Sequence, residues 1–286
     1  SNTIELAKSF VPKLDECYRL ASLTSVLDGA PELAKQGANA NELIIPMMSM
    51  DGLADYSRNG GYVQGGVTMT NETVKCNFDR GRRFDVDVMD DLETAGLAFG
   101  RLSAQFIRDK VVPELDAFRF ASYCGISGVT KKEETLADGA ATVAALSTAV
   151  TAMDDEEVTA TGRYLFITPT LLQGINDMDT TKSKKVLEGF EQVIKVPQRR
   201  SAIKQLSGKT GEEAGGYTKA TGAANINFAI VQKDALIQYT KHAAPKIIAP
   251  ENNPDADAYV FGYRMVGIAK AYKNMLSGMY FSHDKA

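Results

Sequence analysis

Residues that commonly carry catalysis or bind metals are scarce in this sequence. Its 286 residues include two histidines, His242 and His283, and three cysteines. Neither histidine accompanies a serine or cysteine in a recognisable nucleophile motif. The cysteines are too widely spaced for a metal site or a disulfide framework, so we expect reduced thiols in a protein made in the cytosol. These absences predict no catalytic residue, no cofactor and no metal site, and so a protein that is not an enzyme.

A positive surplus and long apolar runs are also missing. Lys and Arg number 32 against 36 Asp and Glu, which gives a net charge of −4. Tight binding to DNA is not expected, because such binding relies on Lys and Arg that displace counterions from phosphates. No run approaches the roughly 18 apolar residues that span a bilayer, so no membrane contact is predicted. The composition, 44% hydrophobic and 24% charged, is that of an ordinary soluble protein.

Phosphate-binding loops are present only in fragments. Gly208-Lys209-Thr210 resembles the end of such a loop, but the required glycine five positions before Gly208 is Ile203. The glycines at 59–66 lack the strand–loop–helix context of a dinucleotide fingerprint. Neither segment therefore predicts a nucleotide cofactor.

What the sequence does have is a Gly-rich, turn-rich stretch at 51–81, which leads into an alternating strand at 82–88. Two strands are expected beside the turns, within 41–50 and 67–78, and polar residues alternate along the second. A ribbon of this kind has no core of its own, and an isolated hairpin is marginal in water. We therefore expect it to lie on another surface, in this chain or in another. The residues predicted to bend it and to contact another subunit are Asn59, Gly60, Gly61, Gly65 and Gly66.

A long helix is predicted directly after the strand. Asp90, Asp91 and Glu93 place acids where the positive end of a helix dipole favours them. Apolar residues then follow one side of the helix as far as Phe118. Pro113 removes one hydrogen-bond donor and predicts a kink or the start of a second helix. If continuous, 90–123 would be about 50 Å long at about 1.5 Å per residue.

An acid–arginine cluster surrounds the junction of strand and helix. One interpretation is a divalent metal site or an acid–base pair built from Asp85, Asp87 and Asp90. The other is a solvated strand face whose arginines pair within or between subunits. We favour the second, because no histidine or further carboxylate motif joins the acids. The predicted contact residues of this cluster are Arg80, Arg82, Arg83, Asp85 and Asp87.

The rest of the chain alternates helices and strands. Helices are predicted at 140–153 and from Pro169 onward, and a surface loop at 206–224. Strands are predicted at 163–167, 226–231, 235–240, 259–272 and 279–282.

This order of parts resembles the major capsid protein of tailed bacteriophages, the fold named for phage Hong Kong 97. Two segments carry the resemblance. One runs from Phe78-Asp79-Arg80-Gly81 through Phe84-Asp85-Val86-Asp87 to Asp90-Asp91-Leu92-Glu93-Thr94. The other comprises the closing strands between 235 and 282, including Ser277-Gly278-Met279-Tyr280.

The resemblance implies an α+β phage capsid fold with an N-terminal arm, an extended β-hairpin loop, a peripheral domain with a long spine helix, and an α/β axial domain. The implied boundaries are 1–40 for the arm, 41–88 for the loop and the strand into the peripheral domain, and 89–159 for the peripheral domain. The axial domain would be 160–250, and 251–286 would return to the peripheral domain.

The implied function is a subunit that self-assembles into hexamers and pentamers of an icosahedral shell around phage DNA. The implied partners are further copies of the chain, a scaffolding protein, a portal, and double-stranded DNA held by non-specific contact. The protein would be assembled in the host cytoplasm and end in the virion. Two alternatives stay open: an encapsulin-type nanocompartment shell, and a metal-dependent enzyme that uses Asp85, Asp87 and Asp90.

Overall fold

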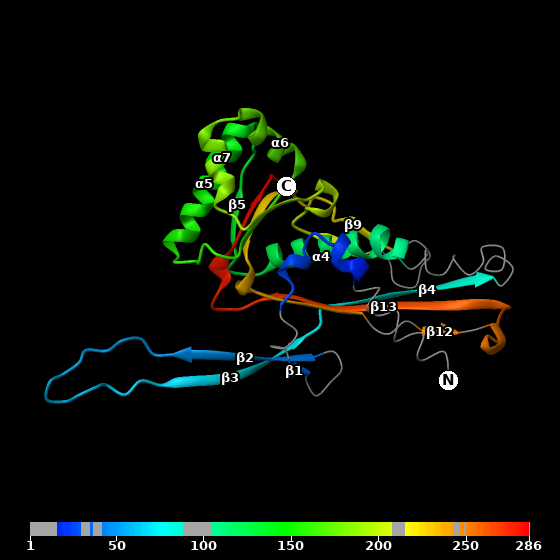
Figure 1. Ribbon diagram of the computed structural model, residues 1–286, viewed down its shortest axis with the longest axis horizontal. Helices are drawn as coiled ribbons and strands as arrows, with labels where there is room; N and C mark the ends of the chain where they lie inside the picture. Colours follow the sequence, from blue (N-terminus) through cyan, green and yellow to red (C-terminus); the bar gives the residue numbers. More distant parts are fainter. Residues whose placement is uncertain are drawn as a thin grey trace.

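The computed structural model describes residues 16–29, 35–36, 42–87, 104–207, 215–242, 246–248 and 250–285. Helices and β-sheets together form the described part, which confirms the predicted α+β class (Figure 1). No helix within these ranges is long and apolar enough to cross a membrane.

One sheet is organised around a single long strand. Its members are β4 (Phe78–Asp87), β11 (Leu236–His242), β12 (Lys246–Ile248) and β13 (Ala258–Ala271). β4 pairs along one side of β13, while β11 and β12 follow one another along the other side, all antiparallel. α4 (Val112–Gly125) crosses this sheet, and Leu115 packs with Phe261 and Met265 in a buried cluster. The alternation predicted at 82–88 is therefore that of a strand with one face toward α4.

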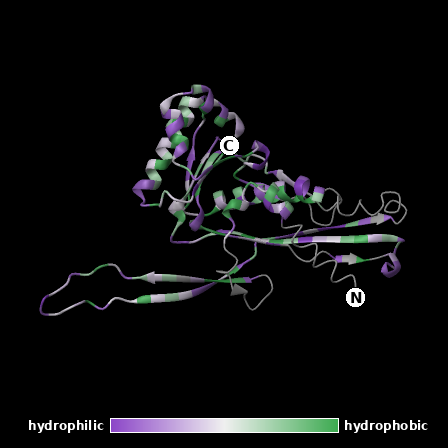
Figure 2. Ribbon diagram, viewed as in Figure 1, coloured by the Kyte–Doolittle hydropathy of each residue, from purple (hydrophilic) through white to green (hydrophobic). Residues whose placement is uncertain are grey.

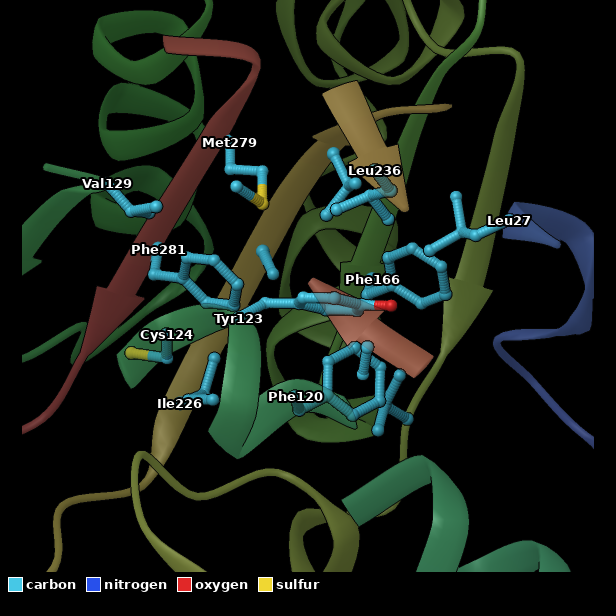
Figure 3. Close-up of a cluster of buried hydrophobic side chains, with 14 of the residues drawn as sticks. Leu27, Phe120, Tyr123, Cys124, Val129, Phe166, Ile226, Leu236, Met279 and Phe281 are labelled. Atoms are coloured by element: carbon cyan, nitrogen blue, oxygen red, sulfur yellow. The ribbon is translucent and has the colours of Figure 1, made fainter. Parts of the chain in front are cut away.

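The second sheet has the order β5-β14-β10-β6-β7. These strands are β5 (Thr130–Glu133), β6 (Arg163–Ile167), β7 (Gln192–Lys195), β10 (Ile226–Gln232) and β14 (Met279–His283). Every residue of β10 is buried, because it is a central strand with both faces covered. On one face lie α5 (Gly139–Asp155), α6 (Pro169–Met178) and α7 (Thr181–Glu188). On the other face, Phe120 and Tyr123 of α4 pack with Phe166 and Leu27 (Figure 3).

Helices α5 and α6 approach closely at a pair of glycines. A Cβ on Gly139 would lie 2.2 Å from the carbonyl oxygen of Gly174, so only glycine fits there. Asp138 caps α5 by accepting a 2.8 Å hydrogen bond from the Ala141 amide.

A long hairpin leaves the body of the molecule (Figure 1). It consists of β2 (Glu42–Met50) and β3 (Val67–Lys75), with β1 (Lys35–Gln36) paired to the start of β2. At its base, Ile45 and Val74 are buried against Ile237 and Ile268 of the long sheet. The predicted ribbon is therefore confirmed, and its base lies on another surface of this chain.

The predicted long helix is described only from residue 104, so Asp90, Asp91 and Glu93 fall outside the described residues. A π-helical turn, Ile107–Val111, directly precedes α4, and Pro113 lies in the first turn of α4. Pro113 cannot donate the usual i→i−4 bond, and a π turn is a known way to absorb such a break. The backbone of Val111 and Val112 stays helical. The helix therefore changes its winding before Pro113 and continues through it.

The predicted domain boundaries cut across the two sheets. α5 and β5, from the segment 89–159, and β14, from 251–286, belong with β6 and β10. The division into arm, loop, peripheral and axial domains stays a prediction.

A buried polar network joins an N-terminal segment, residues 16–29, to α4 and to the chain beside the two sheets. Arg119 of α4 is 1% exposed. It donates to the Tyr18 hydroxyl at 2.7 Å, to Thr24 Oγ1 at 2.8 Å and to Asp28 Oδ1 at 3.2 Å. Burial raises the pKa of Tyr18 to about 12, so its hydroxyl remains a donor to Asp28.

Asp116, one turn earlier on α4, is fully buried and accepts from the same segment. Ser22 Oγ donates to it at 2.8 Å, Thr24 Oγ1 at 2.6 Å and the Leu23 amide at 3.1 Å. Arg200, beyond β7, adds an ion pair at 3.2 Å. One carboxylate thus links the N-terminal segment, α4 and the chain that leaves the second sheet.

Asp116→Ala is expected to lower the free energy of unfolding by about 3–5 kcal/mol, because its hydrogen-bond donors and Arg200 would lose a buried partner. Chemical denaturation would measure it. The exposed control Glu188→Ala should stay within about 0.5 kcal/mol of the original protein. A loss for Asp116→Ala no larger than that of the control would contradict this role.

Candidate assembly surface

Large apolar side chains are exposed mainly on the hairpin. Of the ten exposed large hydrophobic residues in the described part of the chain, only Leu20 and Met275 lie elsewhere. The other eight are Met48, Met50, Leu53, Tyr56, Tyr62, Val63, Val67 and Met69. Figure 2 shows hydrophobic stretches of the ribbon along the strands of the hairpin and toward its tip. Apolar side chains exposed singly are common on protein surfaces, whereas a concentration of them is typical of an interaction site.

Strand register gathers four of these side chains on one face. Met48 lies opposite Met69, and Met50 lies opposite Val67. Directly opposed residues, and residues two apart in a strand, share a face, so the four form one patch, the methionine patch. The opposite face at the same height carries the pair Ser49 and Thr68. The alternation expected along the second strand is therefore present here, and the register adds Met48 and Met50 of the partner strand to its apolar side.

The predicted contact glycines lie at the hairpin tip, residues 51–66. Gly61 adopts a φ of +75°, and its amide bonds to the Ser57 carbonyl at 2.7 Å, which closes the turn. The Gly66 amide donates to Asp51 Oδ2 at 2.7 Å and ties the two strands together where they leave the tip. Asn59, Gly60 and Gly65 are exposed in the same tip. Asn59, Gly60 and Gly61 thus lie at the turn of the tip and Gly66 at its base, and the contact of these five residues with another subunit stays a prediction.

The acid–arginine cluster separates into pairs along β4. Arg83 binds Asp85 at 2.8 Å, and both side chains are about half exposed. Arg80 pairs instead with Glu114 of α4. Arg82 and Asp87 are exposed on the same strand. No three His, Cys, Asp or Glu side chains converge to hold a metal anywhere in the described ranges, and Asp90 lies outside them.

A further pair joins β4 to β13. Arg264 donates to Asp79 at 2.7 Å, and this hydrogen bond lowers the pKa of the Asp79 carboxyl. Sequence patterning missed this pair, because the two residues are far apart in the chain.

A groove of about 810 Å³ lies between β4, the helical stretch before and into α4, and the segments 197–200 and 215–217. Its walls include Phe84, Phe106, Tyr217, Tyr263 and Met265. Its charged lining has five cations and three acids: Arg80, Arg82, Lys110, Arg199 and Arg200, with Asp79, Asp109 and Glu114. We call it the aromatic–arginine groove.

Solved structures with a similar backbone are phage capsids and related particles, whereas no protein-family model and no curated protein matches the chain. The capsid structure of Staphylococcus phage Andhra is 10% identical, with a TM-score of 0.54 over 90% of this chain and 84% of that one. The capsid structure of Cyanophage P-SCSP1u is 13% identical, with a TM-score of 0.53 over 88% and 86%. The chain has the phage capsid fold. A virus-like particle from Pyrococcus furiosus shares it, at 10% identity, a TM-score of 0.51, and 93% and 98% coverage.

The capsid fold confirms the resemblance seen in the sequence. The fold alone does not assign a role to any residue. The exposed surface feature that sequence reasoning missed is the methionine patch. The signal was available in part, because Met48 and Met50 are two apart, as are Val67 and Met69. What was missing was the register that sets one pair opposite the other.

Glu114, which lines the aromatic–arginine groove, is an unusual acid. Its Oε1 atom lies within ion-pairing distance of Arg80 but accepts no aligned hydrogen bond from the described residues. Burial raises the pKa of the Glu114 carboxyl, and the opposing effect of Arg80 does not cancel the shift. The pKa of Glu114 is higher in the folded than in the unfolded protein. The protein is therefore more stable at a pH below the unfolded pKa, and it loses this stability as the pH rises through the folded pKa.

Glu114→Gln should therefore melt at a higher temperature than the original protein at pH 7. The difference should shrink toward about pH 4, where the unfolded carboxyl also takes up a proton. Melting curves across this pH range would measure it, with the exposed Glu188→Gln as a pH-insensitive control. A lower melting temperature for Glu114→Gln at pH 7 would show that the Arg80 pair dominates.

Proposed function

We propose that this chain is a major capsid protein that self-assembles into hexamers and pentamers of an icosahedral shell around phage DNA. The observation that carries this proposal is the capsid fold over 85% or more of the chain, combined with a hairpin whose apolar surface nothing in the described chain covers. Strand edges and apolar faces left open invite aggregation unless a partner covers them. In a closed shell every hairpin has a neighbour to lie on.

The proposed partners follow from the same surface. Further copies of the chain are the main ones, with a scaffolding protein and a portal during assembly. DNA is a non-specific partner, since a net charge of −4 offers no overall basic lining. The proposed location is the virion, after assembly in the host cytoplasm.

A nanocompartment shell is the second candidate, because the virus-like particle shares the fold. Phage structures recur among the similar solved structures, with TM-scores of up to 0.55, and we therefore favour the phage shell. A metal-dependent enzyme has less support, since Asp85 is engaged by Arg83.

Electron microscopy of the purified protein at high concentration tests the proposal. Closed shells or rings are expected, and nucleic acid inside shells purified from infected cells would separate a phage capsid from a cargo-enclosing compartment. Monomers alone, with a melting temperature raised by divalent metal, would favour the enzyme.

Deleting residues 59–66 should leave the subunit folded and impair its assembly, because the tip contributes contacts between copies and none to the core. Circular dichroism should be unchanged, and size-exclusion chromatography should show a loss of large species. Loss of fold together with assembly would mean that the tip supports the subunit itself.

A further inference from the structure

We propose that Asn59, at the tip of the hairpin, is a site of spontaneous modification. In the free subunit the backbone nitrogen of Gly60 attacks the side-chain amide of Asn59, ammonia leaves, and the residue becomes aspartate or isoaspartate. The inference concerns the chemistry of a single chain, so it does not depend on the proposed shell.

The residue that follows Asn59 makes the attack sterically easy. Asn59 is the only asparagine in the sequence that a glycine follows. Glycine has no side chain to shield its backbone nitrogen, and its backbone rotates more freely than that of other residues. Within the described chain, a Cβ at Gly60 would meet only the Cβ and Oγ atoms of Ser57, each at 3.4 Å. The space around the attacking nitrogen is therefore open.

The surroundings of Asn59 also separate it from the other asparagines. Asn59 is exposed in the turn 57–61 and forms no hydrogen bond with the rest of the described chain. The amide of Asn77, in contrast, donates to the Ala269 carbonyl and accepts from the Ala269 amide, both at 3.0 Å. Asn71 is exposed but lies within β3, where the pairing with β2 fixes its backbone. Asn59 alone thus combines a free side-chain amide, a following glycine and access to water.

One hydrogen bond of the turn restrains the attacking nitrogen. The Gly60 amide donates to Ser57 Oγ at 3.1 Å, and this bond must open before the nitrogen can lose its proton and turn toward Asn59. Both groups are exposed, so water competes for the bond and the restraint is partial. The Ser57 hydroxyl is therefore expected to slow the reaction without preventing it.

The reaction needs only water as a second reactant. The Gly60 nitrogen loses its proton and bonds to Cγ of Asn59, while the bond from Cγ to Nδ2 breaks. Nδ2 gains one proton and leaves as ammonia, which produces a five-membered imide. Water then adds its hydroxyl to one imide carbonyl carbon and its proton to the nitrogen. Opening at Cγ gives aspartate, and opening at the backbone carbonyl carbon gives isoaspartate.

Either product changes the tip. Residues 51–66 carry Asp51 and Asp55 against Arg58, a surplus of one negative charge, and the modification adds a second. Isoaspartate also lengthens the main chain by one methylene between Ser57 and Gly61, the span that their 2.7 Å backbone hydrogen bond closes. The expected consequence, weaker assembly of aged subunits, rests on the proposed function.

Peptide mapping of free subunits kept at pH 7 and at pH 9 tests the modification. Pepsin digestion in acid prevents the reaction during sample preparation, because the attacking nitrogen then keeps its proton. We expect Asn59 to gain the mass that replaces NH₂ by OH, as two isomers, and faster at pH 9. Asn71, exposed on the same hairpin, is the internal control and should stay unchanged. Conversion of Asn59 no faster than that of Asn71 would overturn the proposal.

Three variants test the geometry of the turn. Gly60→Ala should slow the conversion at least about tenfold, because a methyl group then shields the nitrogen. Ser57→Ala should accelerate it by releasing the Gly60 amide, whereas the exposed control Ser49→Ala should leave the rate unchanged. All three positions are exposed, so circular dichroism should not change. An unchanged rate in Gly60→Ala would overturn the mechanism, and a slower rate in Ser57→Ala would overturn the role given to Ser57.

The effect on assembly is measured separately. Aged subunits and the variant Asn59→Asp should need a higher concentration to assemble than fresh subunits. If the fresh protein forms no shells or rings, it is the proposed function that fails, and the mapping of free subunits still decides whether Asn59 is modified. The two failures are therefore distinguishable.

Discussion

The rest of the structure depends on one constraint: a two-stranded ribbon cannot bury both of its faces on itself. In this protein the base of the ribbon packs through Ile45 and Val74 on the long sheet, while the outer half carries apolar side chains into solvent. The hydrophobic effect favours covering such a surface by about 25 cal/mol for each Å² buried. In the subunit alone this surface stays exposed, whereas contact with another copy would bury it.

Polar contacts as well as an apolar core hold together the body that carries this hairpin. The buried network of Arg119 and Asp116 fixes the N-terminal segment against α4, and Arg200 extends the network beyond the second sheet. Buried ion pairs often add little net stability, since desolvation offsets their attraction. Their contribution here is geometric, because every hydrogen bond specifies one arrangement of three chain segments. The hairpin base rests on β11 and β13, which α4 and this network hold in place.

How much of this could be predicted from the sequence depends on the range of the interactions. The turn at Asn59-Gly60-Gly61 and the alternation of the long strands are local signals, and both held. Predicting the methionine patch requires the register in which the two strands pair. A connection as long as residues 51–66 does not determine that register from the sequence. No local pattern marks Asp116 and Arg119 as buried, because their partners in the N-terminal segment lie more than 90 residues away. The sheet membership of β14 likewise depends on long-range pairing.

The most direct measurement is the rate at which hydrogen peroxide oxidises individual methionines, followed by mass spectrometry in free subunits and in assembled particles. Met48, Met50 and Met69 should react readily in the free subunit and several-fold more slowly after assembly. Met153 and Met279, buried in the subunit, provide the slow reference in both states. Equal oxidation of the three hairpin methionines before and after assembly would contradict the central claim that a neighbouring copy covers this face.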